Sequence, residues 1–288
     1  MTKREITLAH SPDSDDAFMF YALAANKVES ETLLFSHHLK DIETLNQQAM
    51  KGVWDITAVS FHAVPYISKL YSLLPCGSSM GDGYGPILVS TRSDTPEQLR
   101  GKKIAIPGTL TTAFLVLKLY QPDFQPVVVP FDQIIDAVKE NSVDAGLLIH
   151  EGQLTYNQDG LHRVLDLGVW WKEKFGLPLP LGGNAVRKAL PEPVRREIST
   201  IVRRSIQHAL DYREEALAYA LQFARGMETP VADRFVGMYV NDYTLDYGRQ
   251  GREAIQKLLH MGHEQGLISE APQIEFEDSS EDQTEAVR

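Results

Sequence analysis

The sequence contains little that would support a disulfide-bonded, membrane-spanning or nucleic-acid-binding protein. Cys76 is its only cysteine, which excludes an intrachain disulfide and a multi-cysteine metal site. No apolar run approaches the roughly 20 residues that span a bilayer, and no apolar signal-peptide core follows Met1. With 28 Lys and Arg against 39 Asp and Glu, the net charge of -11 argues against nucleic acid and anionic membranes. We therefore expect a cytoplasmic protein with a small-molecule partner, and the sequence indicates no oligomeric state.

Short apolar runs alternate with helical patterns along the chain, which is typical of an α/β protein with mainly parallel sheets. The length of 288 residues allows two lobes, each with its own core. Strands are predicted at 6–9, 33–38, 56–60, 87–90, 103–106, 127–129, 145–149 and 163–167. Helices are predicted at 18–26, 42–50, 111–120, 131–141, 193–224, 231–240 and 249–265.

Two extended, Gly- and Pro-punctuated stretches near 86–91 and 177–183 divide this pattern. They predict a discontinuous first lobe, residues 1–90 plus 179–270, and a contiguous second lobe, residues 91–178. Two α/β lobes joined by two crossover strands form the periplasmic-binding-protein type of architecture, in which a ligand lies in the cleft between the lobes. Residues 271–288 are rich in Asp and Glu and are expected to form a mobile acidic tail.

His150 is the first candidate for chemistry. It ends the apolar run that begins at Ala145 and is followed directly by Glu151. A titratable imidazole at the tip of a buried strand suits a general acid or base at neutral pH. A helix-capping or packing role explains the same position equally well.

Hydroxyl side chains follow two other predicted strands. Gly108 permits a tight turn before Thr111 and Thr112, which stand beside the free N–H groups of a helix N-terminus. That arrangement is suited to a carboxylate or a phosphate, although a simple Thr N-cap accounts for it as well. Ser60 has the corresponding position after Ala58 and Val59 in the first lobe and is a candidate for a second polar contact.

The turn from Ser11 to Asp16 is rich in residues that cap helices. Asp13, Asp15 and Asp16 resemble the start of a calcium loop, but the Gly and the distant Glu of such a loop are missing. We therefore favour capping for this turn and expect no metal site.

Several ordered stretches give the chain a resemblance to the 1,4-dihydroxy-6-naphthoate synthase family of the futalosine route to menaquinone. The resemblance extends to about residue 268. The matching stretches are Phe20-Tyr21-Ala22-Leu23, residues 41–46, Gly83-Tyr84-Gly85-Pro86, Thr111-Thr112-Ala113, residues 146–151, Leu154-Thr155-Tyr156, residues 166–171 and residues 176–182.

The resemblance implies a cytoplasmic lyase with the two-lobed binding-protein fold and with neither metal nor organic cofactor. Such an enzyme converts an anionic small molecule, cyclic dehypoxanthinylfutalosine, to 1,4-dihydroxy-6-naphthoate. By the same resemblance His150 is the proton-accepting residue, and Ala58, Val59, Ser60, Thr111 and Thr112 bind the substrate.

One departure affects the expected substrate. The family often has Asn and Thr where this chain has Asp15 and Ala17, so an amide and a hydroxyl are lost and negative charge is added. Two alternatives stay open: chorismate dehydratase of the same pathway, which has a related fold, and a solute-binding protein of a transporter. The stretch Ile149-His150-Glu151 and the pair Trp170-Trp171 favour the synthase, and a cleft histidine argues against a solute-binding protein.

Overall fold

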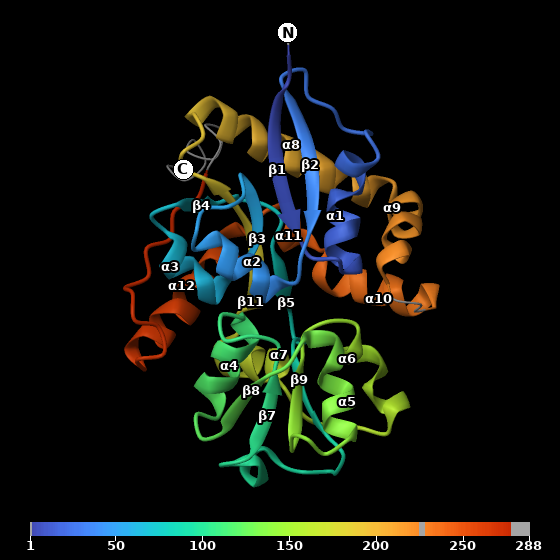
Figure 1. The fold of residues 1–288 in the computed structure, drawn as a ribbon, viewed down its shortest axis with the longest axis vertical. Coiled ribbons are helices and arrows are strands. Elements are labelled where there is room, and N and C mark those ends of the chain that lie inside the picture. The colour runs from blue at the N-terminus through green and yellow to red at the C-terminus, as the bar shows by residue number, and fades with distance from the viewer. Residues whose placement is uncertain (1, 225–227, 278–288) are drawn as a thin grey trace.

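A computed structural model describes residues 2–224 and 228–277, which form two α/β lobes stacked along the long axis of the molecule (Figure 1). The first and last described residues, 2 and 277, both lie in the first lobe, and the second lobe is built from one contiguous stretch. The sheet of the first lobe has the strand order β2-β1-β3-β11-β4, and β5 pairs with β11. Its strands are β1 (Arg4–His10), β2 (Leu33–Leu39), β3 (Ile56–Ser60), β4 (Tyr71–Leu73), β5 (Ser79–Gly81) and β11 (Leu179–Arg187).

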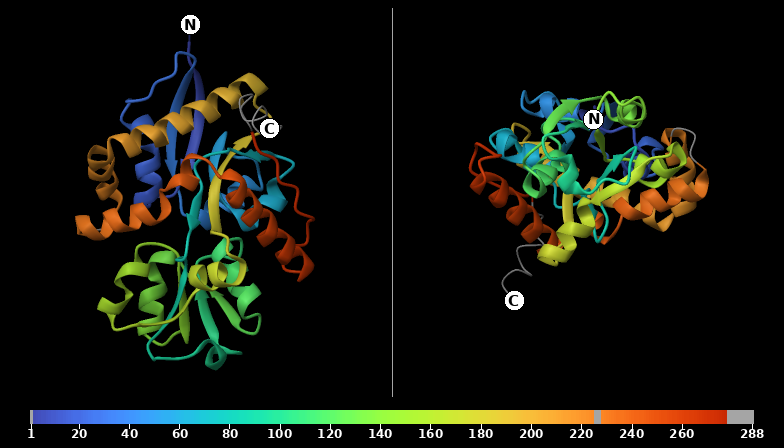
Figure 2. Two further views of the ribbon diagram at one scale, coloured as in Figure 1. Left: turned by 180° about the vertical axis from the view of Figure 1, so that it is seen from behind. Right: turned by 90° about the horizontal axis from the view of Figure 1, so that it is seen from below.

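The second sheet has the order β10-β6-β9-β7-β8. Its strands are β6 (Ile87–Ser90), β7 (Lys103–Ile106), β8 (Gln125–Val128), β9 (Ala145–Leu148) and β10 (His162–Asp166). The strand at residues 87–90 is predicted to belong to the first lobe. In the structure it pairs with β9 and β10 in the second sheet. The chain passes between the sheets through residues 82–86 and again just before β11, as the rear view in Figure 2 shows.

Both sheets are mixed, so the expectation of mainly parallel sheets is wrong. β1 pairs in parallel with β2 and β3, and β7 with β8 and β9. The strands next to the crossings run the other way: β6 is antiparallel to β9, and β11 is antiparallel to β3. A strand that brings the chain directly from one lobe into the other enters its sheet without a βα unit before it, so no parallel crossover is imposed.

The helices cover both sheets and fill the junction. Those of residues 1–90 are α1 (Ser14–Ala24), α2 (Ile42–Ala49) and α3 (Val64–Ile67). The second lobe has α4 (Thr112–Tyr120), α5 (Ile134–Lys139), α6 (Gly152–Thr155) and α7 (Leu167–Phe175). The C-terminal part adds α8 (Glu192–Asp211), α9 (Arg213–Ala220), α10 (Thr229–Tyr239), α11 (Asp242–Leu245) and α12 (Gly248–Glu264).

Helix α1 is the central helix of the first lobe. Phe18, Met19 and Phe20 are each at most 1% exposed, because α8, α9 and α10 pack around the helix. The helix predicted at 193–224 is broken at Tyr212, where the backbone leaves helical geometry, so that α8 and α9 cover different sides of α1. This packing fixes the start of α1 at the junction of the lobes.

The acidic segment does not begin as the expected mobile tail at residue 271. The backbone N–H of Glu277 donates to the carbonyl oxygen of Leu73, and the Glu277 carboxylate pairs with Arg195 at 2.9 Å. Phe276 packs on Tyr247 and under the guanidinium of Arg252. Residues 275–277 therefore lie along β4. The remainder of the predicted tail, 278–288, is outside the described residues.

Within the described residues no helix has the length and apolar character needed to span a membrane.

Candidate active site

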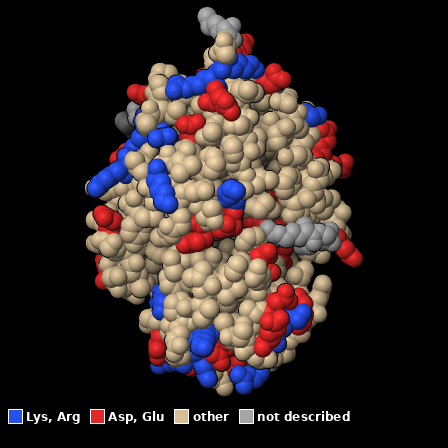
Figure 3. Space-filling model, viewed as in Figure 1, with Lys and Arg blue, Asp and Glu red and all other residues tan. Residues whose placement is uncertain are grey.

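A cavity lies between the lobes, where the ends of β1 and β3 and the middle of β11 face the start of α4. It has a volume of about 120 Å³ and opens to solvent. Ala58, Val59, Ser60, Thr111 and Thr112, the five residues predicted to bind the substrate, all line it. The space-filling view shows Asp and Glu side chains gathered along the same junction on the front of the molecule (Figure 3).

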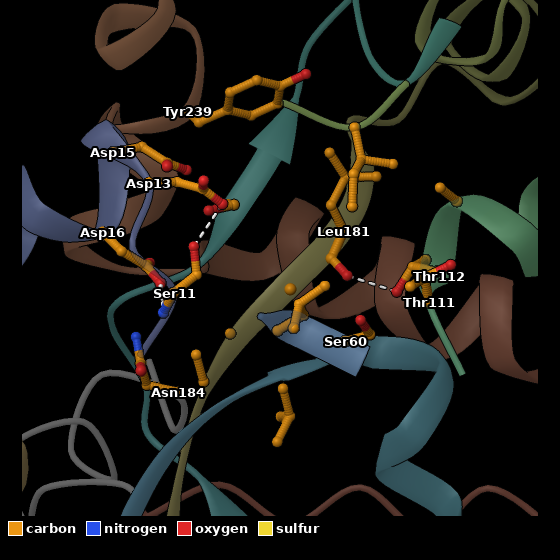
Figure 4. A pocket seen from close by; sticks show the side chains of 18 of the residues that line it. Ser11, Asp13, Asp15, Asp16, Ser60, Thr111, Thr112, Leu181, Asn184 and Tyr239 are labelled. Atoms are coloured by element: carbon orange, nitrogen blue, oxygen red, sulfur yellow. Dashed lines mark hydrogen bonds between the residues drawn. The ribbon is translucent and has the colours of Figure 1, made fainter. Parts of the chain in front are cut away.

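One wall of the cavity carries the acidic turn. Asp13, Asp15 and Asp16 line it together with Ser11 (Figure 4). The Asp16 carboxylate accepts the backbone N–H of Ser11 at 2.7 Å, and the Asp13 carboxylate accepts the Ser11 hydroxyl at 2.5 Å. Asp13 occupies the N-cap position of α1, but its side chain caps no helical N–H. Capping therefore explains why this turn stands directly before α1. It does not explain why the three Asp residues line the cavity.

The crowding of these carboxyl groups changes their acidity. Burial raises the pKa of Asp16 from 3.8 to about 7, against the opposing effect of the Ser11 N–H and with a further contribution from the Asp13 charge. Burial also holds the pKa of Asp15 well above its usual range, reinforced by the charges of Asp16, Asp13 and Glu151. This wall therefore holds at least one carboxyl group that exchanges a proton near neutral pH.

The opposite wall is the N-terminus of α4. Thr111 is its N-cap: its hydroxyl accepts the N–H of Phe114 at 3.3 Å and donates to the carbonyl of Gly108 at 2.8 Å. The Thr112 hydroxyl donates to the carbonyl of Leu181. Both hydroxyls are thus committed within the protein. The groups of this wall that a ligand can use are the first N–H groups of the helix, which have no intrahelical acceptor.

Ser60 completes this end of the cavity. Its hydroxyl oxygen accepts from the side-chain amide of Asn46 at 3.0 Å, and its backbone N–H donates to the same amide at 2.8 Å. No described residue accepts the Ser60 hydroxyl proton, so a ligand in the cavity can do so. Asn46 is fully buried and fixes the orientation of Ser60.

His150 lies beside the cavity and not on its wall. Its ring is 7% exposed, contacts the ring of Phe131 edge to face, and has Nε2 at 3.0 Å from the Phe131 carbonyl oxygen. Its Nδ1 is 3.4 Å from the N–H of Gly152. The preceding residue, Ile149, does line the cavity. The structure therefore places the predicted base next to the site with its imidazole turned into the second lobe.

Glu151 joins the two lobes instead of orienting His150. Its carboxylate lies 3.1 Å from the hydroxyl of Ser14 at the start of α1. Two further contacts cross the junction: the Tyr239 hydroxyl donates to the Gln153 side chain at 2.7 Å, and the N–H of His62 donates to the Thr112 hydroxyl at 3.2 Å. The lobes are thus held together around the cavity.

Gly108 is needed for this closed arrangement. The Glu43 carboxylate of α2 crosses from the first lobe and accepts the backbone N–H of Leu110 at 3.1 Å. A Cβ atom added at Gly108 would stand 2.3 Å from Glu43 Oε2. The predicted turn is present, since the N–H of Thr111 donates to the carbonyl of Gly108 at 3.4 Å. Gly108 does not have a positive φ, so close approach of the other lobe is what favours glycine here.

Sequence reasoning missed Asn184 and Tyr239 as cavity residues. Asn184 lies within β11 and Tyr239 at the end of α10, and neither carries a local motif. The acidic turn did offer a signal, since three Asp follow a strand end that predicts a position at the cleft. In the described residues, no group of three or more His, Cys, Asp or Glu side chains is arranged to hold a metal ion.

Comparison with known proteins agrees with this architecture. Two relatives named 1,4-dihydroxy-6-naphthoate synthase match 93% of the chain: one from Streptomyces coelicolor, 37% identical over 96% of its length, and one from Thermus thermophilus, 39% identical over 97%. A crystal structure of an Archaeoglobus fulgidus protein is 47% identical, covers 92% of this chain and 98% of its own, and has a TM-score of 0.88.

More distant structures share the fold alone. The alkanesulfonate-binding protein of Xanthomonas axonopodis pv. citri is 13% identical, with a TM-score of 0.68 over 95% of this chain and 96% of its own. The predicted two-lobed binding-protein fold is thereby confirmed. Residues 6–264 match a family model described as menaquinone biosynthesis. With that match and the two curated relatives, the chain belongs to the menaquinone-biosynthesis family of 1,4-dihydroxy-6-naphthoate synthases.

Proposed function

We propose that this protein is a cytoplasmic lyase that converts cyclic dehypoxanthinylfutalosine to 1,4-dihydroxy-6-naphthoate without a metal or organic cofactor. The observation that carries the proposal is the cavity between the lobes of a chain whose relatives bear the name of this synthase. All five residues that the resemblance assigns to substrate binding meet in that cavity.

The reaction requires proton removal, ring opening and carbon–carbon cleavage, and formation of the aromatic ring drives it. Such a path needs a base, donors for a developing oxyanion and exclusion of water. The start of α4 and the Ser60 hydroxyl supply donors on one side of the cavity. Hydrogen bonds across the junction, such as that between Glu151 and Ser14, hold the two lobes together beside the cavity.

We propose His150 as the base, in keeping with its role in the resemblance. For this role its ring must leave the Phe131 carbonyl and turn toward the cavity that Ile149 lines. The proton-exchanging carboxyl of Asp16 faces the cavity already and is the alternative base. Substrate binding that displaces the His150–Phe131 hydrogen bond would distinguish the two candidates.

The direct test is incubation of the pure protein with cyclic dehypoxanthinylfutalosine, followed by mass spectrometry. We expect 1,4-dihydroxy-6-naphthoate to accumulate over many turnovers. Binding with return of unchanged substrate would contradict the proposal and indicate a solute-binding protein. Turnover of chorismate in a parallel reaction, with no naphthoate from the first, would indicate the dehydratase instead.

A further inference from the structure

The cavity has two ends of opposite hydrogen-bonding character. Figure 4 shows Ser11, Asp13, Asp15 and Asp16 on one side and Ser60, Thr111 and Thr112 on the other, with β11 passing between them. The first side presents acceptors, and the second presents donors. A ligand with one anionic end and one hydroxyl-bearing end therefore fits in one direction better than in the other.

Asn184 identifies the acceptor end independently of the acidic turn. Its side chain is 1% exposed, lines the cavity, and donates through Nδ2 to the carbonyl of Gly77 at 2.8 Å. Its Oδ1 has no hydrogen-bond partner among the described residues. A buried acceptor without a donor costs about 1–3 kcal/mol, so this position favours a ligand that brings a donor. Figure 4 shows Asn184 on the same side of the cavity as Ser11 and Asp16.

The carboxyl groups of the acidic turn extend the same surface. Three of them line the cavity within four residues of chain, and no Lys or Arg is among the lining residues that the structure describes. An anionic group placed here would be repelled, whereas hydroxyl groups can donate to the carboxylates. The arrangement of the described carboxyl groups is not that of a metal site.

The donor end is built for the anion. Helix α4 has nine residues, and Thr112 and Ala113 in its first turn, where the free N–H groups and the positive end of the dipole lie, line the cavity. The Ser60 hydroxyl adds a donor whose oxygen is fixed by Asn46. A carboxylate here gains charge-assisted hydrogen bonds and lies apart from the Asp side chains, on the other side of the cavity.

We infer that the cavity binds its substrate in one fixed direction, with the carboxylate at the α4 start and Ser60, and the hydroxyl-bearing part at Asn184 and the acidic turn. This inference rests on the proposed function for the identity of the substrate. It assigns to Asp15 and Asn184 the recognition of hydroxyl groups.

Two probes that need no turnover test this direction. 2-Naphthoate carries the carboxylate without hydroxyls, and 1,4-dihydroxy-6-naphthoate carries both. Isothermal titration calorimetry measures each Kd for the wild type, Asp15→Asn and Ser60→Ala. Asp15→Asn is nearly isosteric, and circular dichroism checks the fold of every protein. The same Kd values are measured for Asn184→Ala, which removes the second group proposed to bind the hydroxyls.

We expect the hydroxyls to tighten binding to the wild type about fivefold to tenfold and to lose this advantage in Asp15→Asn and Asn184→Ala. Binding of 2-naphthoate should stay within about twofold in Asp15→Asn. Ser60→Ala should weaken both probes equally, by about tenfold.

The opposite pattern overturns the inference: 2-naphthoate binding that responds to Asp15→Asn and not to Ser60→Ala places the carboxylate at the acidic end. Failure of 2-naphthoate to bind the wild type overturns it as well. These binding results are separate from turnover of cyclic dehypoxanthinylfutalosine, so a failed inference and a failed function give different results.

Discussion

The two helices that begin at the cavity, α1 and α4, use the same structural position in opposite ways. The start of α1 is surrounded by the chain's own carboxyl groups: Asp15 and Asp16 lie in its first turn, and Glu151 contacts Ser14. The first turn of α4 carries no acidic side chain and is capped by the neutral Thr111 hydroxyl. The nearest carboxylate, that of Glu43 from the other lobe, accepts the N–H of Leu110 just before the helix. The N–H groups of Thr112 and Ala113 are thus left for an external anion. The second lobe therefore offers the anion site, and the first lobe offers acceptors.

The largest expected effect comes from His150, the one proposed catalytic group that does not face the cavity. His150→Ala should lower kcat by roughly 10²-fold or more, the usual loss for a positioned base. His162→Ala, an exposed histidine on β10, is the matched control and should leave kcat unchanged. Near-wild-type kcat in a folded His150→Ala would eliminate His150 as the base and transfer the role to the acidic wall.

Gly108→Ala should separate the two walls without altering either. A new methyl group would collide with Glu43, so we expect a larger radius of gyration by small-angle scattering with saturating product and a loss in kcat/KM of roughly 10- to 100-fold. Gly237→Ala, at an exposed helical position where the nearest atom is 3.4 Å from the new Cβ, should change neither quantity. An unchanged radius together with normal activity would show that closure does not depend on this contact.

Asp16→Asn should change the free energy of unfolding by an amount that depends on pH. Because the pKa of Asp16 is about 7 in the folded protein and its usual value is 3.8, the folded state binds the proton more tightly. The contribution of Asp16 to the free energy of unfolding of the wild type is therefore largest below about pH 4 and falls as the pH rises toward 7. The amide can still accept the Ser11 N–H, so Asp16→Asn should be more stable than the wild type by about 1–3 kcal/mol at pH 8, with no gain at pH 4.

Urea denaturation across this pH range measures the difference. Asp123→Asn provides the control, because Asp123 is exposed and precedes β8 at the edge of the sheet away from the cavity. A gain for Asp16→Asn that is equal at both pH values would argue against a titrating group in the wall.

The smallest expected effect concerns the neutral cap of α4. Thr111→Val removes the acceptor for the Phe114 N–H and should lower the free energy of unfolding by about 1 kcal/mol. Thr111→Ser keeps the hydroxyl and should restore stability. A loss of ligand affinity in Thr111→Val far beyond that in Thr111→Ser, at equal stability, would instead show that the hydroxyl itself contacts the ligand.

The sequence predicts the features that depend on local pattern. Apolar runs locate β3 and β7, and the turn before α4 identifies Thr111 as the end of a loop and the start of a helix. The resemblance adds the fold and the family. The break at Tyr212 escaped prediction, because it results from packing of α8 and α9 around a third helix.

Features that depend on contacts between the lobes could not be predicted from the sequence. The close approach of Glu43 to Gly108 and the contact between Glu151 and Ser14 each join segments that are far apart in the chain. The orphan oxygen of Asn184 depends on Gly77, more than a hundred residues away in the chain. A contact between residues so far apart in the chain produces no repeating pattern in either segment, so the sequence cannot indicate it.

A crystal structure of the protein with 1,4-dihydroxy-6-naphthoate tests the contrast between the two walls most directly. We expect the carboxylate within hydrogen-bond distance of the backbone N–H groups at Thr112 and Ala113 and of the Ser60 hydroxyl, with the ring hydroxyls toward Asp15 and Asn184. A carboxylate beside Asp15 and Asn184, or a ligand bound outside this cavity, would contradict the account.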